Sequence, residues 1–367
     1  MSKVRLKDIA SFSKGKQING DQLLVDGIYE YLNGGINPSG KWSSFNVCGD
    51  TIAISEGGNS CGYVNYMAHD FWCGGHCYYL YDVKCLTKYL YYALKSQQDR
   101  IMKLRSGACM PNIKKKDLGD FVFEYNDNLV DQEKIVKEID LIENIIRKQT
   151  QQIEKLDELI KSRFVEMFGD PETESCIYPT FKLKELSIKI SDGVHSKPEY
   201  TDKGRPFLSV VNINRKKVDF TNCKFVSEES YQKMIKSTHP EKGDVLYTKV
   251  GATYGIPAYV DTDIEFCLYV SVCLIKPKHD LINSKYLAIQ MDMPFVKHQA
   301  DRRIKGIGVP DLHLNQISEF DIICPPREIQ DSFVCFVEQT DKSKLVVNKQ
   351  IDKLETLKKS LMQEYFG

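Results

Sequence analysis

The chain has 367 residues, of which 42% are apolar and 27% charged, as in an ordinary globular protein of two or three domains. Fifty basic residues balance fifty acidic ones, so net charge gives no support to a nucleic-acid partner. The best uncharged apolar run, Phe266 to Ile275, is far too short to span a bilayer. The N-terminus has no apolar stretch suited to a signal peptide. We therefore expect a cytoplasmic protein, no membrane partner, and cysteines that are reduced thiols.

The first part of the chain, residues 1–126, is expected to mix helices and strands. Runs of aromatic and β-branched residues, bounded by Gly, Asn and Asp, predict strands at 51–54 and 78–83. Residues 86–104 favour a helix. A glycine-rich loop, SEGGNSCG (55–62), follows the first of these strands.

Four residues in this part suggest a metal site: His69, Cys73, His76 and Cys77. Their side chains are of the types that bind zinc. However, no paired C-x-x-C motif accompanies them, and the second half of the chain has no counterpart. We therefore favour loop and strand thiols beside loop histidines, and predict no metal ion.

A long helix is predicted for residues 127–170. From Ile135 to Ile160 the apolar positions alternate at spacings of four and three, which is a heptad pattern with one polar interruption at Gln149. Neither Pro nor Gly occurs between Leu129 and Phe168. At about 1.5 Å per residue, the pattern predicts a rod of roughly 60 Å.

The second half resembles the first in organisation. Its mixed part is residues 171–324, and a second long helix is predicted at 325–367, beginning at Pro325-Pro326. A glycine-rich loop, KVGATYG (249–255), again follows a predicted strand. The predicted strands are 207–211, 245–248 and 266–275, and the predicted helix is 284–299.

The two halves also match in sequence. Residues 151–169 and 349–367 align with ten identities in nineteen positions at a shift of 198. The offsets are smaller near the start of each half, so the second copy carries early insertions. We infer a domain duplication. The motifs that repeat in the same order are Leu6-Lys7-Asp8 and Leu183-Lys184-Glu185, Gly49-Asp50 and Gly243-Asp244, and Gly107–Pro111 and Gly306–Pro310.

Ordinary helix packing would explain one such apolar pattern. Two similar long helices in one chain are most economically buried against each other. We therefore expect an α+β fold in which two tandem mixed domains are each followed by a long helix. The two helices should pair as an antiparallel coiled coil, with the two copies at its opposite ends.

Motifs for catalysis and nucleotide binding are missing from the sequence. GATYG lacks the GK[ST] ending of a phosphate-binding loop, and no glycine fingerprint for a dinucleotide or S-adenosylmethionine joins a strand to a helix. A G-x-S-x-G nucleophile motif is also missing. The sequence therefore does not predict ATP binding at the GATYG loop.

Basic residues cluster in the two mixed parts. Residues 1–126 contain 15 basic and 12 acidic residues, whereas 127–170 contain 7 and 11. One cluster, Arg100–Arg105, and its counterpart, Arg302–Lys305, both precede the aligned G-x-x-[MV]-P. Asn, Thr and Ser, which contact phosphates and base edges, lie nearby. Such clusters are often only solvated surface, but their equivalent placement favours DNA.

The order and duplication of these motifs resemble the specificity subunit of type I restriction–modification systems over essentially the whole chain. The motifs that carry the resemblance are L-K-[DE]-[IL] at Leu6–Ile9 and Leu183–Leu186, SDGVHSKPEY at 191–200, P-[ND]-[IL] at Pro111–Ile113 and Pro310–Leu312, and the two helix endings.

The resemblance implies a DNA-recognition subunit with no catalytic site. Target-recognition domain 1 would be residues 1–126 and target-recognition domain 2 residues 171–324, each reading one half of a split target in double-stranded DNA. The helices at 127–170 and 325–367 would set the spacing and dock two methyltransferase subunits. Those partners would use S-adenosylmethionine, and a restriction and translocase subunit would use ATP and Mg²⁺.

The candidate contacts are polar residues near the repeated motifs. Arg and Lys would contact guanine or phosphate, and Asn and Thr would contact adenine or backbone. Asp192-Gly193 is instead expected to be a turn, and Phe168 and Phe366 are expected to be packing residues. The DNA-binding candidates are Lys16, Asn59, Ser60, Arg105, Asn112, His195, Lys197, Arg215, Lys249, Thr253, Arg302 and Arg303. The partner-binding candidates are Lys161, Glu166, Lys359 and Glu364.

A different class of function also fits the sequence. The chain could be a non-catalytic protein-interaction scaffold, with two adaptor domains on a coiled-coil strut. Neutral net charge favours the scaffold slightly, whereas the paired basic clusters favour DNA.

Overall fold

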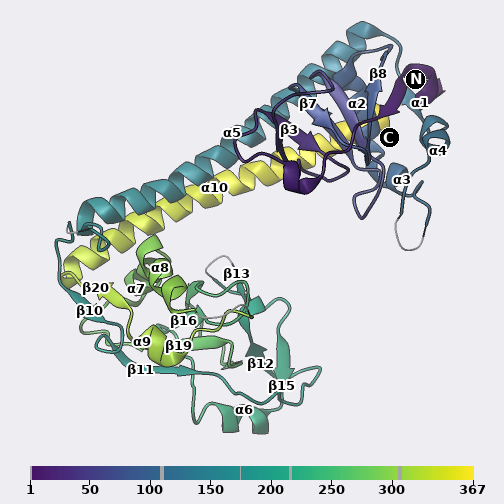
Figure 1. Cartoon of the computed structure of the whole chain (residues 1–367). Helices are drawn as coiled ribbons and strands as arrows, with labels where there is room; N and C mark the ends of the chain where they lie inside the picture. The colour runs from purple at the N-terminus through teal and green to yellow at the C-terminus, as the bar shows by residue number, and fades with distance from the viewer. Residues whose placement is uncertain (1, 108–110, 174, 215–216, 305–307) are drawn as a thin grey trace. The chain divides into compact units, whose positions relative to one another are not determined.

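The computed structural model describes residues 2–107, 111–173, 175–214, 217–304 and 308–367 (Figure 1). The chain folds into two compact units. Unit 1 comprises Met1–Gln152 and Val347–Gly367, and unit 2 comprises Ile153–Val346. Each long helix is therefore divided between the two units.

Unit 1 is built on two sheets. The larger is antiparallel with strand order β2-β8-β5-β6, and the smaller has order β4-β3-β7 with β3 and β7 parallel. A third pairing joins β1 to β9. The strands are β1 (Ser2–Arg5), β2 (Ser11–Lys14), β3 (Tyr29–Leu32), β4 (Gly40–Trp42), β5 (Thr51–Ser55), β6 (Val64–Met67), β7 (Phe71–Cys73), β8 (Cys77–Tyr81) and β9 (Val122–Tyr125); the helices are α1 (Leu6–Ile9), α2 (Thr87–Ser96), α3 (Gln98–Met102) and α4 (Lys115–Gly119).

Unit 2 repeats this topology. Its larger sheet has order β11-β19-β16-β17, its smaller sheet has order β15-β12-β18 with β12 and β18 parallel, and β10 pairs with β20. The strands are β10 (Thr180–Lys182), β11 (Ser187–Asp192), β12 (Arg205–Leu208), β15 (Lys224–Val226), β16 (Val245–Thr248), β17 (Pro257–Tyr259), β18 (Cys267–Leu268), β19 (Val272–Pro277) and β20 (Asp321–Ile323); the helices are α7 (Ser284–Met291), α8 (Pro294–Arg303) and α9 (Leu314–Ser318).

The second copy carries additional elements between β12 and β16. They are the hairpin of β13 (Ile213–Asn214) with β14 (Lys217–Val218), and helix α6 (Glu228–Met234). Two sheets of equal order in both units confirm the duplication, and these extra elements confirm the early insertions in the second copy.

The repeated L-K-[DE] motif has the same role in both units. Leu6 is fully buried, and its N–H donates to the Phe121 carbonyl at 3.0 Å, as that of Leu183 does to Phe320 at 2.8 Å. The lysine that follows each leucine binds a carboxylate near the last strand of the unit. Lys7 pairs with Asp120 at 2.6 Å. Lys184, which follows Leu183, pairs with Glu319 at 2.5 Å.

The long helices are α5 (Leu129–Phe168) and α10 (Arg327–Phe366). Ile139 of α5 lies in the core of unit 1, and Phe168 at its other end lies in the core of unit 2. Helix α10 begins among the core residues of unit 2 and ends with Phe366 in the core of unit 1. The predicted packing roles of Phe168 and Phe366 are confirmed.

Polar contacts between the two long helices run antiparallel within unit 1. Gln149 donates to Gln350 at 3.0 Å, and Glu143 pairs with Lys358 at 2.8 Å. Numbering therefore falls along one helix as it rises along the other. Within unit 2, Lys344 contacts Asp157 at 2.8 Å. Gln149, the one polar interruption predicted in the apolar pattern, thus has a polar partner on the other helix.

Two strand predictions need correction. The apolar run 266–275 is not one strand, because Val272 donates its N–H to the Tyr269 carbonyl at 3.0 Å and this turn separates β18 from β19. The run predicted at 207–211 ends as a strand at Leu208, before a short 3₁₀ turn. In both cases the apolar run extends beyond the point at which the strand of the smaller sheet ends.

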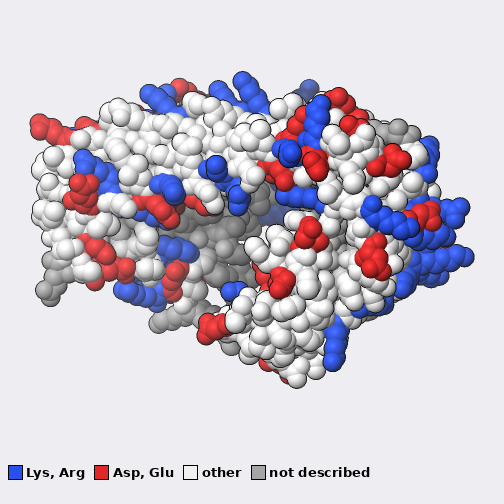
Figure 2. Space-filling view, turned by 90° about the horizontal axis from the view of Figure 1, so that it is seen from above, with Lys and Arg blue, Asp and Glu red and all other residues white. Residues whose placement is uncertain are grey.

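Charged side chains of both signs are interspersed over most of the face drawn in Figure 2. This agrees with the balanced composition of the chain. Among the helices that the structure describes, none combines the length and apolar character needed to cross a membrane.

Candidate nucleic-acid interface

The glycine-rich loop between β5 and β6 is held by the P-[ND]-[IL] motif of the same unit. Gly58 donates its N–H to the Pro111 carbonyl at 3.0 Å, and Ile113 donates to the Glu56 carbonyl at 2.9 Å. Gly58 has a φ of 77°, a conformation that favours glycine. The loop is therefore fixed on both sides by backbone hydrogen bonds.

The loop between β16 and β17 makes the same bonds in unit 2. Gly251 donates to the Pro310 carbonyl at 2.9 Å, and Leu312 donates to the Lys249 carbonyl at 2.9 Å. Gly251 has a φ of 88°. Two motifs that are far apart in the sequence thus form one backbone arrangement, twice, with different side chains on it.

A glycine that follows the first strand of the larger sheet joins each arrangement. Lys16, just after Gly15, donates its N–H to the Cys73 carbonyl at 2.8 Å, and Val194, just after Gly193, donates to Leu268 at 3.0 Å. We call residues 14–16, 55–63, 73–77 and 111–113 loop cluster 1, and residues 192–194, 248–256, 268–272 and 310–312 loop cluster 2.

The structure brings together most of the DNA-binding candidates of unit 1. Lys16, Asn59 and Asn112 are exposed residues of loop cluster 1. Ser60 belongs to the same cluster, but its hydroxyl donates to the Gly34 carbonyl at 2.9 Å and so shapes the loop. Arg105 is exposed beside Ser106, whose backbone pairs with that of Asn112.

In unit 2 the candidates are less closely grouped. His195 is exposed next to loop cluster 2, with its Nε2 3.4 Å from the Asp192 carboxylate, and Thr253 is exposed at the tip of the loop. Lys197 is exposed further along the segment, 5.9 Å from the ring centre of Tyr200. Arg215 lies outside the described residues.

Lys249 is buried, unlike the other cationic candidates that the structure describes. Its ammonium lies 3.4 Å from Asp192 and 3.5 Å from Asp311, and its side chain is 6% exposed. This lysine therefore holds loop cluster 2 together, and a DNA contact by Lys249 stays a prediction that its burial does not favour.

The basic pair at the end of α8 divides into two roles. Arg303 donates to the carbonyls of Gln299 at 2.8 Å and Glu319 at 3.2 Å, with its guanidinium over the Phe320 ring. These contacts hold α8 on its unit. Arg302 is exposed and pairs with Glu172 at 3.0 Å, so it can exchange this partner for a phosphate.

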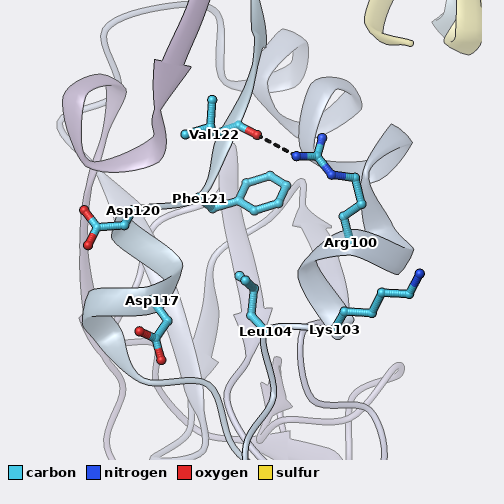
Figure 3. A pocket seen from close by; sticks show the side chains of 7 residues that line it. All are labelled: Arg100, Lys103, Leu104, Asp117, Asp120, Phe121 and Val122. Carbon is cyan, nitrogen blue, oxygen red and sulfur yellow. Dashed lines mark hydrogen bonds between the residues drawn. The ribbon is translucent and has the colours of Figure 1, made fainter.

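The corresponding basic run of unit 1 borders a shallow depression of about 500 Å³ (Figure 3). Arg100 donates to the Val122 carbonyl at 3.2 Å, and its guanidinium lies over the Phe121 ring. Arg100 is therefore engaged in the surface of the unit, as Arg303 is. The depression is lined by Arg100, Lys103, Leu104, Asp117, Asp120, Phe121 and Val122.

The cysteines and histidines of loop cluster 1 and its surroundings do not converge. Cys73 and Cys77 are buried, whereas His69 and His76 are exposed. The pKa of the Cys77 thiol is raised well above its ordinary value. The larger cause is a hydrogen bond with Cys73, and the second is burial of the thiol. Within the described ranges, no three His, Cys, Asp or Glu side chains are grouped so that they could hold a metal ion.

The four partner-binding candidates lie on the surfaces of the long helices. Lys161 and Glu166 are exposed on α5 in unit 2, and Lys359 and Glu364 are exposed on α10 in unit 1. Glu166 pairs with Arg163 of its own helix at 2.8 Å.

Several residues of the loop clusters were missed from sequence. Lys14 and Glu56 form an ion pair in loop cluster 1, and Asp311 shares Lys249 in loop cluster 2. Both tryptophans of the chain also meet beside Lys16: Trp72 donates its Nε1–H to the Lys16 carbonyl at 2.7 Å, and its ring lies edge-on to Trp42. Only the rarity of tryptophan could have indicated them.

The fold and the loop clusters define a duplicated protein whose halves present equivalent loops with different side chains. A family model described as "Type I restriction modification DNA specificity domain" matches residues 1–156 and 178–356. The chain therefore belongs to the family of type I restriction–modification DNA specificity proteins. The resemblance inferred from the sequence motifs is confirmed.

Two relatives come from mycoplasmas. A Mycoplasma pneumoniae protein described as a type I specificity subunit is 36% identical over 163 residues, which cover 44% of this chain and 41% of that protein. A Mycoplasma genitalium protein with the same description is 33% identical over 145 residues, covering 39% and 38%. The chain thus matches about two fifths of the length of these relatives.

Solved structures match the fold over nearly the whole chain. The type I S subunit from M. genitalium has a TM-score of 0.62 at 22% identity, covering 100% of this chain and 96% of that one. A chain from work on assembly of a type I restriction–modification system has a TM-score of 0.59 at 13% identity, covering 99% and 96%. The α+β architecture with long helices is therefore shown.

Proposed function

We propose that this chain is the DNA-recognition subunit of a type I restriction–modification complex, in which each loop cluster reads one half of an asymmetric bipartite target. One observation carries the proposal. The two clusters share their backbone hydrogen bonds, yet place Asn59 and Asn112 in one and Thr253 and Asp311 in the other. A common frame with different side chains suits two unlike half-sites.

In this proposal the long helices have two tasks. Paired as a coiled coil, they would fix the distance between the half-sites, so that affinity requires both halves at one spacing. Their exposed residues would dock two methyltransferase subunits. The duplicated positions Lys161 and Lys359, and Glu166 and Glu364, give two identical partners equivalent surfaces.

The catalytic chemistry would belong to the partners. The methyltransferase subunits would bind S-adenosylmethionine and methylate adenine after flipping it from the duplex. A restriction and translocase subunit would use ATP and Mg²⁺ to cleave unmodified DNA. The chain itself would act in the cytoplasm without a cofactor.

The experiment is reconstitution with the methyltransferase subunit from the same genome. Tagged chain should capture that subunit, and the mixture should transfer labelled methyl groups from S-adenosylmethionine to adenine in unmodified genomic DNA. The chain alone should bind DNA weakly and without selectivity. Capture of no methyltransferase, with no methyl transfer by the mixture, would rule the proposal out.

The scaffold alternative predicts a different result. A non-catalytic scaffold of two adaptor domains would bind protein partners but would show no salt-dependent binding to DNA, either alone or with the methyltransferase. The reconstitution therefore separates the two functions in one preparation.

A further inference from the structure

The two loop clusters can be compared residue by residue through their sheets. In unit 1, Lys14 at the end of β2 is the register partner of Tyr78 in β8, and Tyr78 is in turn the partner of Ile54 in β5. In unit 2, Asp192 at the end of β11 pairs across β19 with Cys273, which pairs with Tyr247 of β16. Lys14 and Asp192 therefore occupy the same place in the two folds.

The loop residues facing them are also equivalent. Glu56 lies two residues after Ile54 and accepts the N–H of Ile113 through its carbonyl, and Lys249 lies two residues after Tyr247 and accepts that of Leu312. Thus each fold has one charged residue at the strand end and one at the start of the loop.

The charges at these two places are exchanged. In unit 1 the strand end carries Lys14 and the loop carries Glu56. The Lys14 Nζ lies 2.5 Å from the Glu56 Oε1. In unit 2 the strand end carries Asp192 and the loop carries Lys249, 3.4 Å apart. The backbone frame is the same, but its ion pair is reversed.

The charge exposed at the surface also differs between the two clusters. The loop member is the more buried one in both units, with Glu56 11% exposed and Lys249 6% exposed. A buried charge requires an opposite partner. In unit 1 the exposed partner is Lys14, at 49%. In unit 2 Asp192 at the equivalent strand end is only 13% exposed, and the exposed partner of Lys249 is Asp311, at 45%.

We propose that Asp311 is a specificity-determining residue of loop cluster 2, which accepts a hydrogen bond from a base amino group, whereas Lys14 at the rim of loop cluster 1 donates to a base acceptor or a phosphate. The proposal rests on the DNA-recognition function and deepens it. In the major groove a carboxylate pairs with the amino groups of cytosine and adenine, and a lysine pairs with guanine O6 and N7.

Asp311 is suited to this role by its support. Its carboxylate is oriented by Lys249, which Asp192 also holds, and the backbone of Asp311 pairs with that of Val250 in the loop. Asn112 stands at the same place in loop cluster 1, where its backbone pairs with that of Gly57. The same backbone position thus presents an amide in one half and a carboxylate in the other.

The test is Asp311→Asn, which installs the side chain found at the equivalent place in unit 1. Methylated adenines are mapped in cells that produce the variant with its methyltransferase partner. We expect one base-pair position of one half-site to lose its preference by roughly tenfold, with the other half-site and the spacer unchanged. Asp192 still neutralises Lys249, so the melting temperature should stay near that of the wild type.

The matched control is Asp263→Asn. Asp263 is a more exposed aspartate of unit 2 that also pairs with a lysine, Lys242, at 3.2 Å. It should leave the methylated sequence unchanged. A second variant, Asp311→Glu, keeps an acceptor and should keep the preference for an amino-bearing base while weakening methylation.

The exchange itself is tested in unit 1. Glu56→Lys alone places two ammonium groups together and should lower the melting temperature. Adding Lys14→Asp recreates the arrangement of unit 2 and should recover more than about half of that loss. The double variant should also change one position of the other half-site, which a purely structural pair would not do.

The outcomes distinguish a failure of the proposed function from a failure of the role proposed for Asp311. A wild-type complex that methylates no adenine overturns the proposed function. A wild-type complex that methylates one motif, together with Asp311→Asn that methylates the same motif with every base preference intact, overturns the role of Asp311.

Discussion

Gly15 and Gly193 lie where the end of one strand passes directly over the backbone of the smaller sheet. A Cβ at Gly15 would lie 2.1 Å from the Cys73 carbonyl oxygen, and one at Gly193 would lie 1.9 Å from that of Leu268. Backbone cannot yield as a flexible side chain can, so these positions require glycine. The turn expected at Asp192-Gly193 is not formed: Asp192 is the last residue of β11, and Val194 after the glycine pairs in parallel with Tyr269 next to β18.

Gly15→Ala should therefore destabilise unit 1 by about 1–3 kcal/mol, the usual cost of overpacking. Gly20→Ala is the control, because nothing lies within 4 Å of the Cβ it would add. Thermal unfolding of both variants checks the prediction. Equal melting temperatures would show that the backbone at Gly15 moves aside freely.

A second residue-scale prediction concerns acid. The hydrogen bond from Lys7 lowers the pKa of Asp120, and that from Lys184 lowers the pKa of Glu319. A carboxylate with a lowered pKa stabilises the fold above its unfolded pKa, and this contribution disappears as pH falls through the folded value.

The variant Asp120→Asn with Glu319→Gln should accordingly melt below the wild type near neutral pH. The difference should shrink as pH falls below about 4, the ordinary pKa of such carboxylates in the unfolded chain, and towards their lowered pKa values in the folded protein. Melting temperatures measured from pH 7 to pH 3 test this. A difference that stays constant with pH would mean that the two ion pairs contribute no stability.

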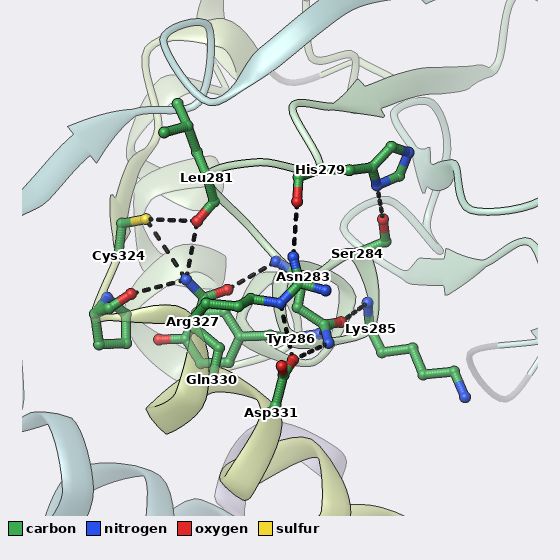
Figure 4. Close-up of polar contacts among 11 residues, drawn as sticks. His279, Leu281, Asn283, Ser284, Lys285, Tyr286, Cys324, Arg327, Gln330 and Asp331 are labelled. Carbon is green, nitrogen blue, oxygen red and sulfur yellow. Dashed lines mark hydrogen bonds and ion pairs between the residues drawn. The ribbon is translucent and has the colours of Figure 1, made fainter.

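At the scale of elements, a buried glutamine joins each long helix to a shorter one. Gln330 of α10 donates to the carbonyls of Leu281 and Pro325 and accepts the N–H of Asn283, the residue just before α7 (Figure 4). Gln132 of α5 likewise accepts the N–H of Leu86, the residue just before α2. The two glutamines are 198 positions apart, the same shift that aligns the helix endings, and both are fully buried.

Gln330→Ala leaves two carbonyls and one N–H without this partner, and should cost on the order of 2–3 kcal/mol. Gln339→Ala on the exposed side of the same helix should cost little, since its side-chain amide donates to the Cys335 sulfur one turn away and is otherwise open to solvent among the described residues. Urea unfolding compares the two. Similar losses in both variants would assign the effect to helix propensity rather than to the network.

The sequence predicted the elements better than their contacts. Period and composition were sufficient for the long helices and for strands such as β5, because each carries its own local pattern. The prediction of one strand at 266–275 was wrong, because composition cannot show where a chain passes from one sheet to another. The burial of Lys249 also could not be predicted, because its partners Asp192 and Asp311 lie 57 and 62 residues away in the numbering.

At the scale of the whole molecule, the duplication gives each unit the same parts. Each contains one mixed domain, the beginning of the helix that follows it and the end of the other helix. The repeated helix endings place Lys161 in one unit and Lys359 in the other, both exposed. In the proposed docking, two copies of one partner would meet equivalent side chains.

Lys161→Glu and Lys359→Glu should each weaken capture of the methyltransferase subunit by roughly three- to tenfold, because both would lie in equivalent interfaces. Lys148→Glu, an exposed position outside the repeated endings, is the control. Titration of the subunit onto immobilised chain measures the effect. Unequal losses at the two positions would contradict equivalent docking.

The most direct test of the account is to map methylated adenines in DNA from cells that produce the chain with its methyltransferase partner. Two unlike loop clusters on one duplicated frame predict a single asymmetric motif, made of two specified half-sites separated by a spacer of fixed length. A continuous motif, a symmetric one, or methylation without sequence preference would contradict the reading of one half-site by each unit.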